Sequence, residues 1–265
     1  MTFTSYHNHT IWSDGLATVQ EMIESARRAG LVELGFSDHF ALTPGNQHLR
    51  WALPPDSLDS YVSEIQWAIA STKDITVRMG LEVDYFPETA DLIKSRLAAH
   101  SFDYLIGSVH FVDDFPIDLD AQPWEELSQS ARDSVWRGYW RCLRAAAQSG
   151  IFDIIGHFDL PKKFKFGPSV DLTEEAFAVL SAVSAADMAI EINTSGWDKP
   201  AGEAYPSLFY LQEAMRRKIP LVINSDAHST GEVVRHFDRA RQLARNAGYT
   251  ELVRFERRQR FLYPL

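Results

Sequence analysis

Short apolar runs rich in β-branched residues alternate with amphipathic helical patterns along the whole chain, and this alternation is what most restricts the fold. Several runs carry apolar residues on both faces, as parallel strands buried on both sides require. Seven strands, each followed by a helix, predict an α/β fold. It would be a (β/α) barrel with one βα unit fewer than the usual eight. The strands are expected at residues 3–9, 32–38, 76–83, 104–110, 152–157, 189–193 and 220–225.

Capping signals and apolar periodicity define the helices between these strands. Thr18 and Glu21 form a capping box at the start of the first helix, and Gly30 ends it. The longest helix is expected at 124–148, and further helices are expected at 56–71, from Pro87, and at 173–187, 206–217 and 234–247. We find no linker, repeat or low-complexity segment, so residues 1–265 are expected to form a single domain. The tail 254–265 is expected to be an edge strand or a packed tail.

The composition argues against several classes of function. With 265 residues and 45% hydrophobic composition, the chain can bury a sizeable core. Its net charge of −10 makes nucleic acid an unlikely main partner, because phosphate backbones need a basic surface. The single cysteine, Cys142, provides neither a disulfide framework nor a thiolate zinc site. No apolar run is long enough to span a bilayer and no signal peptide is evident, so a cytoplasmic protein is expected.

Residues that ligate metals stand at the ends of most of the expected strands, where a parallel barrel collects its chemistry. Side chains alternate along a strand, so His7 and His9 project to the same side, and the next loop can return the Asp14 carboxylate over the strand end. The strand at 189–193 ends in polar but weakly ligating residues. The other strand ends supply Asp38, His39, Glu82, Asp84, His110, His157, Asp226 and His228.

This regular placement favours a metal cluster over independent structural residues. A lone buried histidine is usually a hydrogen-bonded core residue, yet six of the nine histidines fall at strand ends. His48, His100 and His236 fall in helices or loops. A buried cluster of carboxylates and imidazoles is costly without a cation to neutralise it. Imidazole and carboxylate ligands suit zinc, iron or manganese, and the sequence leaves the choice among them open.

Taken together, these segments resemble the polymerase and histidinol phosphatase (PHP) family, and the monofunctional bacterial histidinol-phosphatases in particular. The resemblance implies a distorted seven-stranded TIM-like barrel that holds two to three divalent metals. The matching segments span nearly the whole chain in family order. They are His7-x-His9 with Asp14, followed by 37–39, 80–84, 107–111, 154–160, 191–196 and 225–228.

Carried over residue by residue, the resemblance implies three ligand sets, two of which share Glu82 as a bridge. These are His7, His9, Glu82 and Asp226; Glu82, His110 and His157; and Asp14, His39 and His228. The cations would hold the phosphate oxygens while a bridging water, as hydroxide, attacks phosphorus in line with the leaving alkoxide. Glu82, Asp226 and His228 are the expected catalytic residues. Either Asp226 or His228 could return a proton to the alkoxide.

The implied reaction is hydrolysis of L-histidinol phosphate to L-histidinol and phosphate, a step of histidine biosynthesis. The recognition segment departs from the family pattern, because Asp198 stands where the arginine of an Arg-Lys pair is expected. The segment 229–232, which follows His228, is altered as well. We therefore expect Lys162 or Lys163 to contact the phosphate. Trp197 and Asp198 are expected to contact the rest of the substrate or to lie outside the pocket.

Three alternatives stay open at this stage. The first is the same chemistry on another small phosphate ester. The second is a nucleic-acid phosphodiesterase of the kind that occurs attached to polymerases, against which the acidic composition counts. The third is a metal-bound regulatory protein without catalytic activity, against which nine competent ligands count. The expected partner is a small phosphorylated metabolite, and the oligomeric state is left open.

Overall fold

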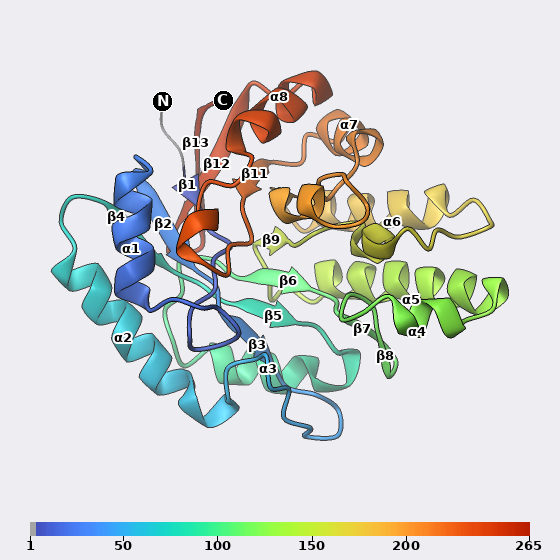
Figure 1. Cartoon of the computed structure of the whole chain (residues 1–265), viewed down its shortest axis with the longest axis horizontal. Helices are drawn as coiled ribbons and strands as arrows, with labels where there is room; N and C mark the ends of the chain where they lie inside the picture. Colours follow the sequence, from blue (N-terminus) through green and yellow to red (C-terminus); the bar gives the residue numbers. More distant parts are fainter. Residues whose placement is uncertain (1–3) are drawn as a thin grey trace.

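Parallel strands form the centre of the computed structural model, which describes residues 4–265 (Figure 1). A three-stranded sheet has the order β1-β2-β4, formed by Thr4–Ser5, Glu33–Phe36 and Thr76–Met79. A six-stranded sheet has the order β11-β10-β9-β6-β5-β3, formed by Leu221–Asn224, Ala189–Asn193, Ile154–Ile155, Ile106–Ser108, Glu82–Asp84 and His39–Ala41. All strand pairs in both sheets are parallel. The chain therefore has the predicted α/β fold with parallel sheets.

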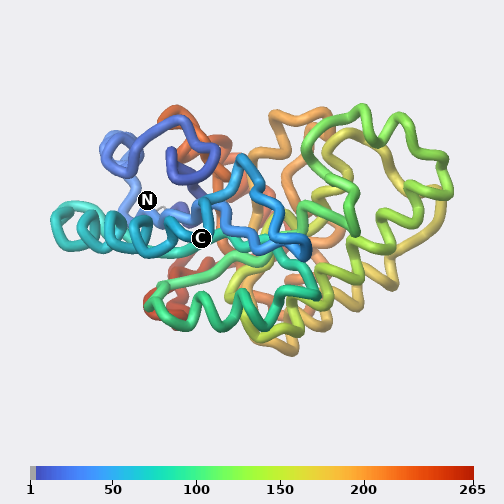
Figure 2. Tube along the Cα trace, turned by 90° about the horizontal axis from the view of Figure 1, so that it is seen from below, coloured from blue at the N-terminus to red at the C-terminus, as the bar shows by residue number. Residues whose placement is uncertain are grey.

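Helices lie on the outside of these strands. The first two helices lie on one side of the molecule, and α5 and α6 lie on the other (Figures 1 and 2). The Thr18–Glu21 capping box is confirmed, with both reciprocal hydrogen bonds present. None of the helices within residues 4–265 is both long and apolar enough to cross a membrane. The helices are α1 (Val19–Arg28), α2 (Leu58–Ser71), α3 (Ala90–Leu97), α4 (Gln122–Glu126), α5 (Gln129–Gln148), α6 (Thr173–Ala185), α7 (Leu208–Arg216) and α8 (Phe237–Ala247).

One of the expected strands ends early and another is divided in two. The run at 32–38 forms β2 and contributes to the turn before β3, and the run at 76–83 forms β4 and the start of β5. Gly35 and Gly80 lie near these breaks and leave room for the ring of Tyr104, since a Cβ at either would lie within 2.4 Å of that ring or its hydroxyl. The Tyr104 hydroxyl donates to the carbonyl oxygens of Tyr6 (2.6 Å) and Phe36 (2.9 Å). Tertiary packing of this tyrosine thus accompanies the interruption of both strands.

Other boundaries also differ from the predictions. The expected helix at 124–148 is divided at Leu127, because Ser128 caps a new helix by accepting a hydrogen bond from the Ala131 amide. The tail forms an antiparallel hairpin of β12 (Glu251–Glu256) and β13 (Gln259–Pro264). Phe3 of the first expected strand lies outside the described residues. Short elements complete the chain: β7 (Phe111–Val112), β8 (Phe115–Pro116), η1 (Pro55–Ser57), η2 (Pro87–Thr89), η3 (Leu160–Phe164), η4 (Thr194–Asp198) and η5 (Thr230–Glu232).

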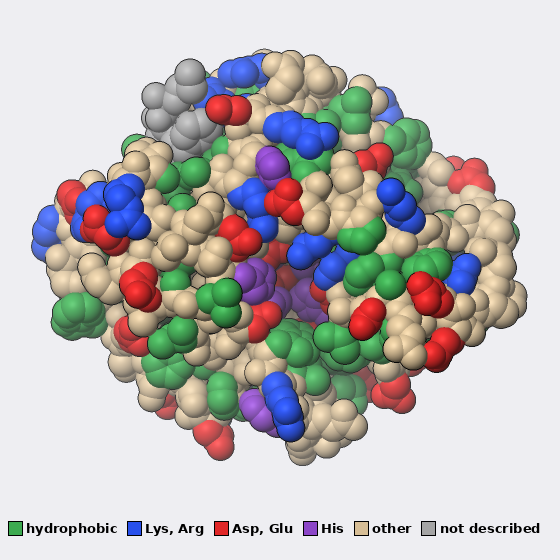
Figure 3. Space-filling view, in the orientation of Figure 1, with side chains coloured by type: hydrophobic (Ala, Val, Ile, Leu, Met, Phe, Trp, Pro, Cys, Tyr) green, Lys and Arg blue, Asp and Glu red, His purple; other side chains and the backbone are tan. Residues whose placement is uncertain are grey.

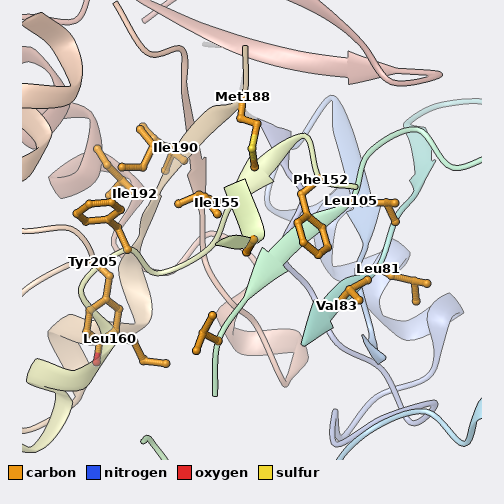
Figure 4. Close-up of a cluster of buried hydrophobic side chains, with 14 of the residues drawn as sticks. Leu81, Val83, Leu105, Phe152, Ile155, Leu160, Met188, Ile190, Ile192 and Tyr205 are labelled. Atoms are coloured by element: carbon orange, nitrogen blue, oxygen red, sulfur yellow. The ribbon is translucent and has the colours of Figure 1, made fainter. Parts of the chain in front are cut away.

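Buried apolar side chains form two large clusters and a small one of Ala41, Ala52 and Phe86. Residues that point outward from the strands pack against the helices in one large cluster, which includes Val83, Phe152 and Ile190 (Figure 4). A second cluster consists of Tyr6, Tyr104, Ile106, Ile154, Ala189, Val222, Val253 and Phe255. The hairpin closes this second cluster at the amino ends of the strands. The carboxyl ends are thereby left to polar side chains.

Candidate active site

The Glu82 carboxylate lies among five imidazoles that come from four separate segments of the chain. Its oxygens are 3.0 Å from His7 Nε2, 2.8 Å from His39 Nδ1 and 2.8 Å from His157 Nε2. His9 Nε2 and His110 Nε2 lie slightly farther away, at 3.5 and 3.6 Å. Glu82 is 1% exposed. The carboxyl ends of parallel strands meet at one edge, and this is why residues so distant in sequence surround one carboxylate.

The remaining predicted ligands extend this cluster toward solvent. Asp226 Oδ1 lies 3.3 Å from His9 Nε2 and 3.6 Å from His228 Nδ1. Asp14 Oδ1 lies 3.2 Å from His228 Nε2 and 3.7 Å from His39 Nε2. The structure thus brings all nine predicted ligand residues into one connected cluster.

The donor atoms of the cluster fit metal ions. His7 Nε2, both ring nitrogens of His9 and Glu82 Oε2 are buried without a hydrogen-bond partner among the described residues. Buried polar atoms without partners are costly, and a bound cation would satisfy them. Three groups have ligand atoms that all lie within 4.8 Å of one another. They are His9, Asp14, His39 and His228; His7, His9 and Glu82; and His39, Glu82 and His110.

Two groups of the cluster already have the protonation state that a metal ion needs. Burial lowers the pKa of His9 to about 3, and the neighbouring His39 and His228 contribute in the same direction. Burial alone would raise the pKa of Glu82, but His7 and His39 outweigh burial and hold that pKa well below its usual range. At neutral pH, Glu82 is therefore ionised and His9 is unprotonated. Both are the forms that bind metal ions. At three others, neighbouring carboxylates outweigh burial and raise the pKa of His7, that of His110 to about 10 and that of His228 to about 9, so metal binding there displaces protons.

Glu191 orients the cluster although it was not among the predicted site residues. It is fully buried in β10. Its carboxylate accepts hydrogen bonds from His7 Nδ1 (3.0 Å), Asn224 Nδ2 (2.8 Å) and the His157 amide (2.7 Å). A carboxylate only accepts, so His7 Nδ1 carries a proton and Nε2 faces the Glu82 carboxylate in the cluster. The available signal was an acidic residue inside an otherwise apolar strand.

A cavity of about 380 Å³ opens onto the cluster. Figure 3 shows this hollow, with histidine side chains inside it and acidic and basic side chains around it. Seven of the nine predicted ligands line the cavity: Asp14, His39, Glu82, His110, His157, Asp226 and His228. Its walls include Trp51, Phe111, Asp118, Lys163, Ser195, Lys199, Tyr205, Glu232 and Arg235. The volume suits a small metabolite.

Only one of the four predicted substrate-binding residues lines this cavity. Lys163 lines it, with Nζ 2.6 Å from the Asp118 carbonyl oxygen and 3.1 Å from its carboxylate. Lys162, Trp197 and Asp198 do not line it. Their contacts lie elsewhere: Lys162 Nζ is 2.9 Å from Asp159, the Trp197 ring packs under Arg239, and Asp198 is 2.8 Å from His236 Nε2.

Lys199 is a cavity residue that the sequence reasoning did not select. Within residues 4–265, no hydrogen bond or ion pair reaches its ammonium group. Its position as the lysine of the expected Arg-Lys pair was the signal that could have identified it. Trp51, which lies 4.8 Å from the His39 ring between centroids, gave no such signal because it belongs to no motif.

A parallel α/β fold that gathers six histidines and three carboxylates under one cavity defines a protein built to hold several metal ions. The family model of the PHP domain matches residues 5–195, which is most of the chain. The chain belongs to the PHP domain family.

Comparison with known proteins agrees with this assignment. The chain is 35% identical to a probable histidinol-phosphatase of Deinococcus radiodurans, over 91% of this chain and 92% of the relative. It is 30% identical to the histidinol-phosphatase of Bacillus subtilis, over 82% and 89% of the two chains. The crystal structure of the Lactococcus lactis histidinol phosphate phosphatase, complexed with zinc, L-histidinol and phosphate, has a similar fold. Its TM-score is 0.80, with 22% identity over 98% of this chain and 100% of the other.

Proposed function

We propose that this chain is a metal-dependent phosphomonoesterase that hydrolyses L-histidinol phosphate to L-histidinol and phosphate. The observation that carries the proposal is the cluster of nine ligand residues below a small cavity. It occurs in a chain that is 35% identical to a probable histidinol-phosphatase over 91% of its length. A cavity of this size accepts a phosphorylated metabolite far better than a nucleic-acid strand.

Two or three divalent ions of zinc, iron or manganese are proposed to occupy the cluster. The ligand sets are those implied by the family resemblance, with Glu82 shared by the first and second sets. When bound, such cations neutralise the phosphate oxygens and bring the pKa of a bound water close to neutrality. Glu82 also lies 2.8 Å from His39 of the third set, and Glu191 keeps His7 oriented toward Glu82 through its 3.0 Å hydrogen bond.

Side chains around the cavity are proposed to bind and orient the ester. Lys199 contacts the phosphate because its ammonium is available, and Lys163 adds positive charge on the same cavity. The carboxylate of Asp118, with the rings of Trp51 and Phe111, provides an acidic and aromatic wall for a cationic leaving group. Asp226 or His228, which both line the cavity, relays a proton to the leaving alkoxide.

We infer that the strands close into a distorted seven-stranded barrel within a single domain of residues 1–265. Asn8 and Ala227 form a parallel bridge, in which the His9 amide donates to the Ala227 carbonyl (2.8 Å) and the Ala227 amide to the His7 carbonyl (3.1 Å). This bridge joins the chain after β1 to the chain after β11. If β2 continues as β3 and β4 as β5, the strands number seven. The second apolar cluster, which contains Tyr6 and Tyr104, would then fill the barrel.

The deciding experiment is phosphate release by metal-replete protein from a panel of esters. The panel contains L-histidinol phosphate, several other small phosphomonoesters and a short single-stranded DNA. We expect L-histidinol phosphate to give the highest kcat/KM and the Glu82→Gln variant to be inactive on every substrate. Preference for another monoester would keep the chemistry and replace the substrate. Nucleotide release from DNA with no monoester hydrolysis would contradict the proposal.

A further inference from the structure

The turn that carries Asp226 and His228 has a backbone conformation that needs support from its surroundings. Asp226 has a φ of 52°, in the left-handed region that residues other than glycine seldom adopt. Such a conformation persists only where neighbouring groups hold it in place. Both residues belong to the ligand cluster, so the groups that hold this turn also determine where two ligands point.

Arg235 contacts the backbone of this turn, which backbone hydrogen bonds of Ala227 with His7 and His9, and of His228 with Leu16, also hold. Its Nη2 donates to the carbonyl oxygens of Ser225 (2.7 Å) and Asp226 (3.0 Å), and its Nη1 donates to Glu232 Oε1 (3.0 Å). The other oxygen of Glu232 accepts hydrogen bonds from the amides of His228 (2.8 Å) and Ser229 (3.0 Å). The Arg235–Glu232 pair therefore holds the turn on both sides of the Asp226–His228 segment.

The Asp226 carboxylate is restrained from the opposite side by β10 and the residues that follow it. Oδ2 accepts hydrogen bonds from Asn193 Nδ2 (3.0 Å) and Ser195 Oγ (3.2 Å). Oδ1 is then left to face His9 Nε2 at 3.3 Å. With the carboxylate fixed at Oδ2, any rotation of the 225–226 peptide would pull Oδ1 away from the cluster.

Asp198 belongs to the same network, because its Oδ2 lies 3.5 Å from Arg235 Nε and its Oδ1 lies 2.8 Å from His236 Nε2. Arg235 Nε is buried and has no hydrogen-bond partner among the described residues, so Asp198 is the group that balances its charge there. An arginine at position 198 would place two guanidinium groups together. Asp198 and the altered segment 229–232 thus both contact the side chain of Arg235.

We propose that Arg235 is a positioning residue that sets metal affinity by holding the Asp226 turn, and that Asp198 serves Arg235 rather than the substrate. The inference rests on the proposed function, because it takes the cluster to be a metal site. It differs from a role in phosphate binding, since the guanidinium is already engaged by two carbonyl oxygens and a carboxylate.

The test measures zinc affinity by competition with a chromophoric chelator, alongside kcat and KM. Arg235→Ala should weaken the zinc that Asp226 ligates by on the order of tenfold to a hundredfold, as loss of an orienting partner does at other metal sites. KM for L-histidinol phosphate at saturating zinc should stay within about twofold. Glu232→Gln and Asp198→Arg should also weaken zinc. The matched control is Arg239→Ala, a neighbour that packs over Trp197 at 4.4 Å and should leave zinc affinity unchanged.

Unchanged zinc affinity in Arg235→Ala, together with a KM raised about tenfold or more, would overturn the inference and make Arg235 a substrate contact. If Arg235→Ala fails to fold, Arg235→Lys and Glu232→Gln decide, and zinc affinity at the wild-type level in both would overturn it. The zinc titration needs no substrate. A wild-type protein that binds zinc but leaves L-histidinol phosphate intact would therefore contradict the proposed function alone.

Discussion

Replacement of Lys199 by alanine should weaken catalysis by removing the phosphate contact that the protein itself supplies. Of the cationic side chains that line the cavity within residues 4–265, Lys163 is bound to Asp118 and Arg235 to Glu232, whereas the Lys199 ammonium has no partner. The change therefore leaves no protein group unpaired. A hydrogen bond to a charged group contributes about 1.5–3 kcal/mol. The expected loss in kcat/KM is thus roughly tenfold to 150-fold.

The assay is the initial rate of phosphate release from L-histidinol phosphate at several substrate concentrations, with metal content matched between variants. Lys162→Ala should stay within about twofold of the parent, because that ammonium is held by Asp159 and Glu203 away from the cavity. Lys73→Ala, in the exposed segment that follows α2, controls for the loss of one positive charge. A Lys199→Ala variant with wild-type kcat/KM beside a strongly impaired Lys162→Ala variant would refute this reasoning.

Three further perturbations test the site and the fold. Asp226→Ala and His9→Ala should abolish turnover while circular dichroism stays native, and near-normal activity in metal-replete buffer would remove that residue from the site. Removal of metal with a chelator should abolish turnover and lower the unfolding temperature, since free metal at 100 times the Kd of its site adds about 2.7 kcal/mol to the free energy of unfolding. An unfolding temperature that does not change when zinc is added would argue against metal binding. Gly35→Ala should destabilise by about 1–3 kcal/mol in urea unfolding, because its Cβ would lie 2.3 Å from the Tyr104 hydroxyl. Gly45→Ala, with 3.7 Å to the nearest atom, should cost far less, and equal losses would contradict the packing argument.

The convergence of the nine proposed ligand residues could be predicted because their positions follow from the topology. The carboxyl ends of parallel strands meet at one edge, so His7, Glu82 and Asp226 converge although they are far apart in sequence. Sequence alternation and strand order contain this information before any tertiary contact is known. For the same reason the α/β class was predictable, and so were the Thr18–Glu21 cap and the approximate positions of the strands.

Glu191 and Lys199 carried sequence signals, whereas other features that escaped prediction depend on tertiary contacts that no local pattern encodes. The strand breaks accompany the insertion of Tyr104 beside Gly35 and Gly80, which only the packed structure shows. Asp198 looked like a substrate residue from its place in a motif, yet its side chain pairs with Arg235 and His236. Such pairings depend on how loops from different strands pack over the cavity. The residue type at one position gives no information about them.

The most direct test is to count the metals and measure turnover on one preparation of the purified protein. Elemental analysis should find at least two equivalents of transition metal per chain, and the same sample should release phosphate from L-histidinol phosphate. Glu82→Gln should lose both metal and activity, because Glu82 joins the ligand sets. Active protein with one equivalent or none would contradict the multinuclear site, and a fully metallated sample that releases no phosphate would contradict the proposed reaction.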